Sequence, residues 1–227
     1  MAGNPVYVAL DSPDLAHAEH LARLVAPHVG GLKLGLEFFM ANGPEGVRRL
    51  GRIGLPVFLD LKLHDIPNTV KGALRALSGL PLSIVNVHAG GGLPMLEAAA
   101  EAKPEGAKLI AVTVLTSLDA ADLVRTGVTD GPAAQVARLA ALSKEAGLDG
   151  VVCSAREVAA LKRDWADGLF VVPGIRPEGA RESDQKRVMT PRQALDAGST
   201  VLVIGRPITA APDPAAAAAA IAATIAG

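Results

Sequence analysis

Three polar side chains alternate with leucines in the segment Val57–His64, which is otherwise strongly apolar. Asp60, Lys62 and His64 occupy every second position, so in a β-strand they share one face and the leucines share the other. Unpaired buried charge is costly, so we expect Asp60 and Lys62 to pair in a partly desolvated site and to serve a chemical purpose there. The alternative is an exposed edge strand with a solvated polar face.

Two more charged residues follow the same pattern in other apolar runs. Asp11 directly follows the run Val6–Leu10, and Lys33 lies between two leucines in the next run. Together with Asp60 and Lys62 they form two pairs of opposite sign on three successive strands. Such a neutral cluster can be held where the dielectric is low and each charge acts strongly on the others.

A second set of polar residues lies near the carboxyl end of the chain. Gly205 and Arg206 end an apolar run, and Arg176 follows another one, just before the polar stretch Pro177–Arg187. Backbone N–H groups and a cation after the last two strands of a parallel barrel commonly form a phosphate site. The sequence therefore predicts an anion site at Arg176, Gly205 and Arg206, with Pro177–Arg187 as a mobile lid.

These residues require a scaffold that brings many strand ends together. Helical segments such as Pro67–Leu77 and Ala133–Ala146 separate eight short apolar runs, and this alternation is typical of a parallel sheet. At roughly 28 residues per unit it favours the α/β class and a (β/α)8 TIM barrel, with a single domain over 1–227. A doubly wound open sheet is the alternative, but no Gly-x-Gly-x-x-Gly turn follows the first run. The predicted strands are Val6–Leu10, Gly31–Gly35, Val57–Leu63, Ile84–Ala89, Leu109–Leu115, Gly150–Ser154, Leu169–Val172 and Thr200–Gly205.

Composition excludes several other classes of protein. Of 227 residues, 50% are hydrophobic and 20% charged, with a net charge of −1, so no basic field exists for nucleic acid or an anionic membrane. No run is long and apolar enough for a membrane helix. One cysteine, Cys153, rules out an intrachain disulfide framework and fits a reducing cytoplasm. We expect a soluble cytoplasmic protein with no nucleic-acid or membrane partner.

Several other polar residues have a structural interpretation, and one of them has a functional interpretation as well. Ser12 and Thr190, each followed by proline, are predicted to cap helices. His88 is expected to be an interior histidine and Cys153 a small packing residue. Thr116, near the end of the fifth run, fits a helix cap and a hydrogen-bond donor to a ligand equally well.

The segment Leu59–Thr69 resembles the signature of the orotidine 5′-phosphate decarboxylase family, with the pattern Asp-x-Lys-x-x-Asp-Ile intact. His64 and Pro67-Asn68-Thr69 resemble the bacterial branch. Matching islands follow the family's order over nearly the whole chain. They are Ala9-Leu10-Asp11, Lys33, Leu115-Thr116-Ser117, Pro173-Gly174-Ile175-Arg176, Asp184-Gln185-Lys186-Arg187 and Gly205-Arg206.

The resemblance implies an enzyme without cofactor or metal that converts orotidine monophosphate to uridine monophosphate and carbon dioxide, the last step of de novo pyrimidine nucleotide synthesis. It implies that Lys62 protonates C6 of the pyrimidine, with Asp60 beside the departing carboxylate. Asp65 would reach the partner's site in a homodimer with shared active sites. The catalytic residues that the resemblance implies are Lys33, Asp60, Lys62 and Asp65.

The remaining implied contacts surround the substrate. Asp11 and Lys33 would bind the ribose, with Thr69 helping from across the dimer, and Thr116 would contact the base. The phosphate would be held by Arg176, Gln185, Gly205 and Arg206, with Gln185 on the closing loop. The full implied binding set is Asp11, Lys33, Asp60, Leu61, Lys62, Leu63, His64, Asp65, Ile66, Pro67, Asn68, Thr69, Thr116, Arg176, Gln185, Gly205 and Arg206.

Two alternative functions remain for such a barrel. A metal-dependent phosphosugar enzyme, such as a 3-keto-gulonate-phosphate decarboxylase or a ribulose-phosphate epimerase, needs carboxylate or histidine ligands near the ends of the second and third strands. Here the second strand supplies Lys33, whose ammonium group would repel a metal ion. A non-catalytic phosphate-binding barrel would be expected to have lost one charge of the cluster, and none is lost.

Overall fold

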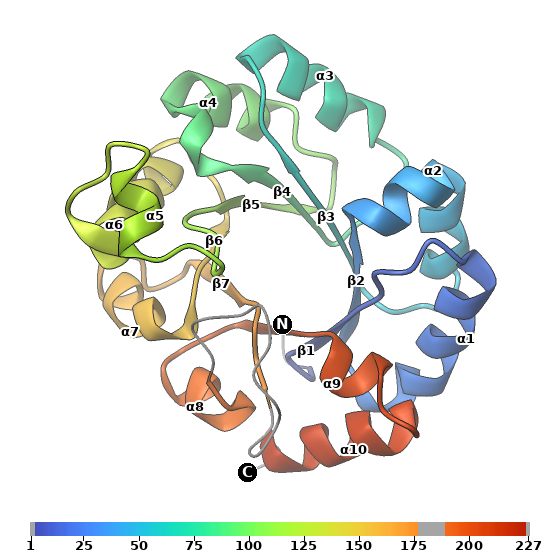
Figure 1. Ribbon diagram of the computed structural model, residues 1–227. Helices are drawn as coiled ribbons and strands as arrows, with labels where there is room; N and C mark the ends of the chain where they lie inside the picture. Colours follow the sequence, from blue (N-terminus) through green and yellow to red (C-terminus); the bar gives the residue numbers. More distant parts are fainter. Residues whose placement is uncertain (1–2, 177–188, 226–227) are drawn as a thin grey trace.

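Eight strands alternate with helices along the chain, and the helices form a ring around the strands (Figure 1). The computed structural model describes residues 3–176 and 189–225. The strands are β1 (Val6–Ala9), β2 (Gly31–Gly35), β3 (Val57–Leu63), β4 (Ile84–His88), β5 (Lys108–Val112), β6 (Gly150–Val152), β7 (Leu169–Val172) and β8 (Val201–Ile204). The helices are α1 (Leu15–Val25), α2 (Leu36–Gly51), α3 (Pro67–Ala76), α4 (Leu93–Glu101), α5 (Ala120–Val124), α6 (Gly131–Glu145), α7 (Ala155–Asp164), α8 (Pro191–Asp196), α9 (Arg206–Thr209) and α10 (Pro214–Ile225), with short 3-10 turns η1 (Ala26–His28) and η2 (Ala89–Gly91).

The sheet closes on itself. Each strand pairs in parallel with the next one in sequence, and β1 pairs with β8, so that Tyr7 lies opposite Gly31 on one side and Val203 on the other. Closure leaves none of these eight strands at an edge, which excludes both the open doubly wound sheet and the exposed edge strand as interpretations of the sequence. The predicted TIM barrel is confirmed.

Side-chain alternation divides the core into two layers. On the outer face of the barrel, large strand residues such as Leu59 and Phe170 pack against the surrounding helices. They meet Phe38 of α2 in this layer, and all three side chains are fully buried. The barrel interior is a separate cluster of Tyr7, Ala9, Phe58, Ile84, Ile110, Leu169, Val171, Val201 and Val203. The interior cluster forms the floor beneath the charged residues of β2 and β3.

Two predicted helix caps have different outcomes. Thr190 caps α8 in a capping box with Gln193, as predicted. Ser12 does not cap α1, which begins later, because the carboxylate of Asp14 accepts hydrogen bonds from the N–H groups of Ala16 and His17. Asp14 is as good a cap as serine, and Pro13 therefore precedes the helix instead of starting it.

Within the described ranges, no helix has both the length and the apolar character that a membrane crossing would require.

Candidate active site

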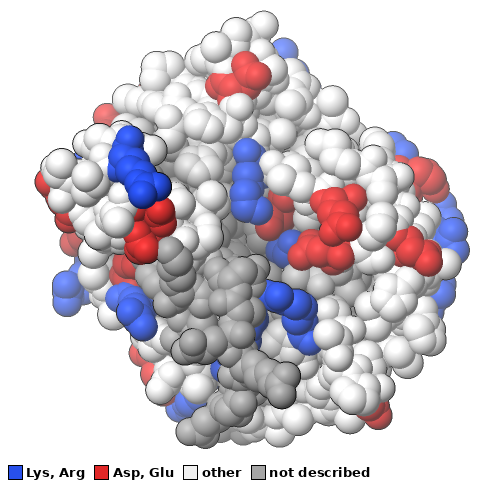
Figure 2. Space-filling view, viewed as in Figure 1, with Lys and Arg blue, Asp and Glu red and all other residues white. Residues whose placement is uncertain are grey.

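A cavity of about 590 Å³ lies at the end of the barrel where the carboxyl ends of the strands meet. Basic and acidic side chains gather around a hollow near the centre of this face (Figure 2). Parallel barrels place their reactive groups at this end because the loops that follow the strands converge there. Of the residues expected to act together, the structure brings eight to this cavity: Asp11, Lys33, Asp60, Lys62, Thr116, Arg176, Gly205 and Arg206.

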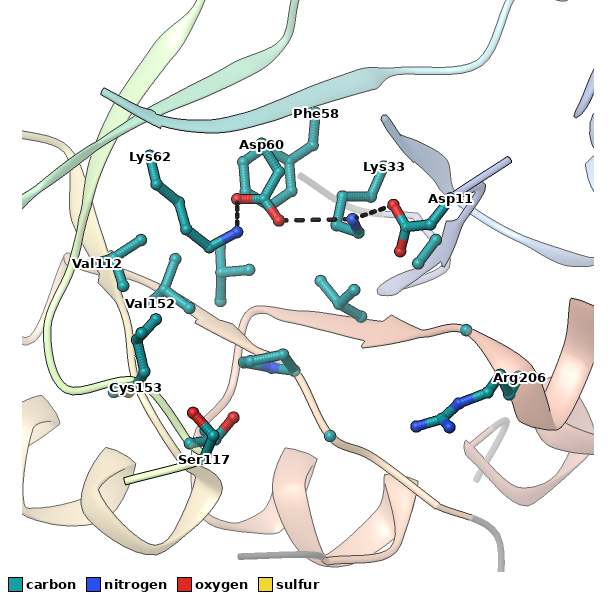
Figure 3. Close-up of a pocket in the computed structure, with 18 of the residues that line it drawn as sticks. Asp11, Lys33, Phe58, Asp60, Lys62, Val112, Ser117, Val152, Cys153 and Arg206 are labelled. Carbon is teal, nitrogen blue, oxygen red and sulfur yellow. Dashed lines mark hydrogen bonds and ion pairs between the residues drawn. The ribbon is translucent and has the colours of Figure 1, made fainter. Parts of the chain in front are cut away.

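Four charged side chains of alternating sign form a row along one wall of the cavity (Figure 3). Lys33 Nζ lies 2.9 Å from Asp11 Oδ1 and 3.4 Å from Asp60 Oδ2. The other oxygen of Asp60 lies 2.7 Å from Lys62 Nζ. Lys33 and Asp60 are buried, the Lys62 side chain is a third exposed, and Asp11 is half exposed. The row therefore begins at Asp11, which is exposed to solvent, and ends at the ammonium group of Lys62, which is accessible to a ligand.

The neighbouring lysines keep Asp60 ionised. Burial is the largest single influence and would raise the pKa of this carboxyl, but the charges of Lys33 and Lys62, together with hydrogen bonds to the carboxylate, outweigh it. Hydrogen bonds from Lys62 and Asn86 act in the same direction, and the pKa of Asp60 lies below its ordinary value. Asp60 therefore carries a fixed negative charge between the positive charges of Lys33 and Lys62.

The absence of a side chain at Gly35 allows the first pair of the row to form. A Cβ atom built on this last residue of β2 would lie 2.3 Å from Asp11 Oδ1 and 2.9 Å from Lys33 Nζ. Neither approach is possible for a real Cβ atom without displacing the ion pair. Glycine is thus required by close packing of charged groups at this position.

β3 is irregular where it presents Lys62. Leu59 lies opposite Val85 and Leu63 opposite Val87, so four steps along β3 match two along β4. At Lys62 the backbone has φ 52°, in the left-handed region that non-glycine residues rarely adopt. Bulges of this kind re-aim a side chain at the rim of a barrel.

His64 does not share the inward face with Asp60 and Lys62, so this part of the sequence interpretation is wrong. β3 ends at Leu63, one residue after the irregular backbone at Lys62, and His64 lies beyond it, exposed and stacked on His88. The ring centroids of the two histidines are 5.2 Å apart.

Asn86 of β4 is a site residue that the sequence interpretation missed. Its side chain is fully buried and hydrogen-bonds both the carboxylate of Asp60 and the backbone N–H of Lys62. The only signal in the sequence is a polar residue inside an apolar strand, two positions before His88.

The remaining walls of the cavity come from the later strands. Thr116 and Ser117 line it from the segment after β5, which ends at Val112 and not at Leu115 as predicted. Arg176 follows β7, and Arg206 begins α9 directly after Gly205. Figure 3 shows the Arg206 guanidinium extending into the cavity at a distance from the row of charges.

Eight described residues of the implied binding set do not line this chain's own cavity. Leu61 and Leu63 pack on the apolar layer between barrel and helices. Gln185, and the predicted lid Pro177–Arg187 with it, lies outside the described residues. Six consecutive residues, all exposed, follow the end of β3: His64, Asp65, Ile66, Pro67, Asn68 and Thr69.

Cys153 and His88 are placed close to the expectations for them. Cys153 is almost fully buried, as a packing residue would be, and also lines the cavity. His88 is partly buried, and burial lowers its pKa, with smaller contributions from His64 and Lys62. Among residues 3–176 and 189–225, no three His, Cys, Asp or Glu side chains are grouped closely enough to hold a metal ion.

Comparison with known proteins gives the chain its family. The model of the Orotidine 5'-phosphate decarboxylase / HUMPS family matches residues 4–221. This chain belongs to that family. The curated relatives that match this chain are named orotidine 5'-phosphate decarboxylase.

Relatives in this family align over nearly their whole length. One from Novosphingobium aromaticivorans is 58% identical over 222 residues, covering 98% of this chain and 99% of its own. Another, from Sphingopyxis alaskensis, is 56% identical over the same shares of both chains. A crystal structure of orotidine 5'-phosphate decarboxylase from Lactobacillus acidophilus is 39% identical, with a TM-score of 0.85, and covers 99% of this chain and 100% of that one.

Proposed function

We propose that this protein decarboxylates orotidine 5′-monophosphate to uridine 5′-monophosphate and carbon dioxide, the last step of de novo pyrimidine nucleotide synthesis, without a metal or cofactor. The observation that carries the proposal is the row Asp11–Lys33–Asp60–Lys62, which ends in an ammonium group inside a cavity of nucleotide size. Membership in the decarboxylase family supports it.

Lys62 is proposed as the proton donor. Loss of carbon dioxide from C6 of the pyrimidine leaves negative charge on that carbon. An ammonium group fixed beside C6 stabilises this charge and then supplies the proton that replaces the carboxyl group. The ion pair with Asp60, at 2.7 Å, fixes the position of Lys62 Nζ before substrate enters.

Asp60 is proposed to lie beside the departing carboxylate. Its pKa is lowered, so it is ionised when substrate arrives, and one of its oxygens is shared between Lys62 and Asn86. In this position Asp60 favours the transition state, in which negative charge moves from the substrate carboxylate onto C6, over the bound substrate.

Binding of the rest of the nucleotide is assigned to the other cavity residues. Asp11 and Lys33 are proposed to bind the ribose hydroxyls, Thr116 the base, and Arg176, Gly205 and Arg206 the phosphate. Gln185 completes the phosphate site in this proposal, although it lies outside the described residues. Phosphate binding far from C6 can favour closure and exclusion of water, and so contribute to the chemical step.

The active site is proposed to be shared between two copies of the chain. Asp65 is exposed and does not line the cavity of its own chain. Its carboxylate accepts a hydrogen bond of 2.7 Å from the backbone N–H of Ile66. Ile66 is itself 67% exposed, and Met40 of α2 is 76% exposed. β2 and β3 are neighbouring parallel strands, and α2 and α3 follow them in sequence. Both helices therefore begin at the same end of the barrel.

A two-fold interface on this apolar surface would bury Ile66 and Met40 and carry Asp65 into the partner's cavity, with Thr69 beside it. Leu61, Leu63, His64, Pro67 and Asn68 would then act by shaping the segment that reaches across. In this arrangement each site uses Lys33, Asp60 and Lys62 of one chain and Asp65 of the other.

The position of Lys33 supports the proposal that the reaction needs no metal. Its ammonium lies between two carboxylates at the end of β2, where a metal-dependent barrel needs a ligand. A cation at that position neutralises the carboxylates and repels a divalent ion. The cytoplasm is the proposed location, because the one cysteine of the sequence cannot form an intrachain disulfide.

The proposal is tested by the substitution Lys62→Ala. Conversion of orotidine monophosphate is followed by ultraviolet absorbance, with Lys144→Ala on the exposed surface of α6 as the matched control. Loss of both the proton and the local charge is expected to lower kcat by about 10⁴-fold, while the control keeps wild-type kcat. A Lys62→Ala protein that folds, keeps kcat and changes only KM would refute the role of Lys62.

A further inference from the structure

Asn86 connects β4 to the two reactive positions of β3. It is 0% exposed, its Nδ2 donates to Asp60 Oδ1 at 2.7 Å, and its Oδ1 accepts from the backbone N–H of Lys62 at 2.8 Å. A backbone N–H can only donate and an ionised carboxylate can only accept, so the amide satisfies both groups in one orientation alone. Neither a leucine nor a carboxylate of similar size could satisfy both.

The hydrogen bond to Lys62 lies where β3 leaves the regular ladder. Four steps of β3 match two of β4 between Leu59 and Leu63, so the backbone of Lys62 has no regular strand partner there. Among the described residues, Lys62 is the one non-glycine residue with positive φ, 52°. Such a conformation persists only when the surrounding structure over-determines it. The Asn86 amide supplies the partner that the ladder does not.

The hydrogen bond to Asp60 fixes the other half of the ion pair. Asp60 Oδ1 receives both Asn86 Nδ2 and Lys62 Nζ, each at 2.7 Å, while Oδ2 lies toward Lys33. Asn86 does not line the cavity, so it acts on a ligand only through these two residues. One buried amide therefore sets the backbone of Lys62 and the carboxylate that its side chain contacts.

We propose that Asn86 is a positioning residue that holds β3 in its bulged conformation and so places the Lys62 ammonium and the Asp60 carboxylate together at the reacting carbon. The inference rests on the proposed function, because it assigns Lys62 and Asp60 to the chemical step. It predicts that changes at Asn86 affect kcat more than KM, since the ribose and phosphate contacts come from other strands.

Two substitutions separate positioning from a general effect on folding. Asn86→Leu removes both hydrogen bonds at similar size. Asn86→Asp keeps an acceptor for the Lys62 N–H but places a second carboxyl next to that of Asp60. The hydrogen bond between positions 86 and 60 then forms only when the two carboxyls share a proton. The equivalent change at Asn42, whose amide donates to carbonyl groups on the outside of the barrel, is the control.

Wild-type turnover of orotidine monophosphate is measured first, and failure there would refute the proposed function and not the role of Asn86. With turnover established, Asn86→Leu is expected to lower kcat by about 100-fold at every pH, with KM little changed. The kcat of Asn86→Asp, relative to wild type, is expected to rise as pH falls, because the shared proton restores the donor to Asp60. Asn42→Asp is expected to follow the wild-type profile.

The pH profile of Asn86→Asp decides the question. A profile parallel to that of the wild type, in a protein that circular dichroism shows to be folded, overturns the inference whatever Asn86→Leu does. A loss confined to KM in both variants also overturns it, because misplacement of Lys62 and Asp60 must appear in the chemical step.

Discussion

Gly35→Ala should separate Asp11 from Lys33 without touching either charged residue. The new Cβ atom would lie 2.3 Å from Asp11 Oδ1 and 2.9 Å from Lys33 Nζ, whereas ordinary contacts of a Cβ begin at 3.4 Å. The Asp11 carboxylate must therefore withdraw by about 1 Å, which breaks its 2.9 Å contact with Lys33. Asp11 and Lys33 are the proposed ribose contacts, so substrate binding should suffer.

The size of the effect follows from the exposure of the pair. A hydrogen bond between charged groups contributes about 1.5–3 kcal/mol, and the lower end applies here because the Asp11 side chain is half exposed to water. We therefore expect kcat/KM for orotidine monophosphate to fall by about tenfold, with most of the change in KM.

Steady-state absorbance assays measure both constants directly. Gly72→Ala is the matched control, because a Cβ on this exposed residue of α3 meets nothing within 4 Å. If folded Gly35→Ala protein has the kcat/KM of the wild type, the Asp11–Lys33 geometry is not what the substrate requires and the reasoning fails.

Three further outcomes follow from the same site. Arg206→Ala should raise KM by about 10- to 100-fold with a smaller effect on kcat, and guanidinium ion should partly restore activity; an effect on kcat alone would remove Arg206 from the phosphate site. Mixing inactive Asp65→Ala and Lys62→Ala proteins should yield hybrid dimers with one intact site, so activity per hybrid should approach half that of a wild-type dimer; chain exchange without recovered activity would contradict the shared site. Burial lowers the pKa of His88, so the folded protein binds fewer protons there than the unfolded chain, and stability should decline as pH falls from about 6.5 through the lowered pKa. Thermal melts of His88→Asn should show a shallower decline than those of His20→Asn on the exposed side of α1, and equal slopes would refute this role of His88.

The sequence predicts the barrel well because burial and periodicity carry most of the signal. All eight apolar runs became strands, with differences of a few residues at their ends, as at β5, which stops at Val112. Parallel strands are buried on both faces, so their apolar runs are conspicuous. Helix starts are harder to predict, because Ser12 and Asp14 are both good caps and only the path of the chain decides between them.

The site was predictable at the level of charge but not of backbone. Alternation placed Asp60 and Lys62 on the same face, and the structure joins them in one ion pair. The same alternation continues unbroken to His64, so the pattern holds no trace of the bulge at Lys62 or of the end of the strand. Asn86 was missed for a related reason: its function depends on a cross-strand register that a single sequence does not contain.

The central claim is that fixed charges of this chain decarboxylate orotidine monophosphate without a metal. The most direct measurement is the release of carbon dioxide from carboxyl-labelled orotidine monophosphate by protein exhaustively treated with EDTA. We predict stoichiometric release of carbon dioxide and uridine monophosphate at the rate of the untreated protein, because Lys33 and Lys62 supply the positive charge. Loss of activity on chelation that magnesium restores would contradict the account.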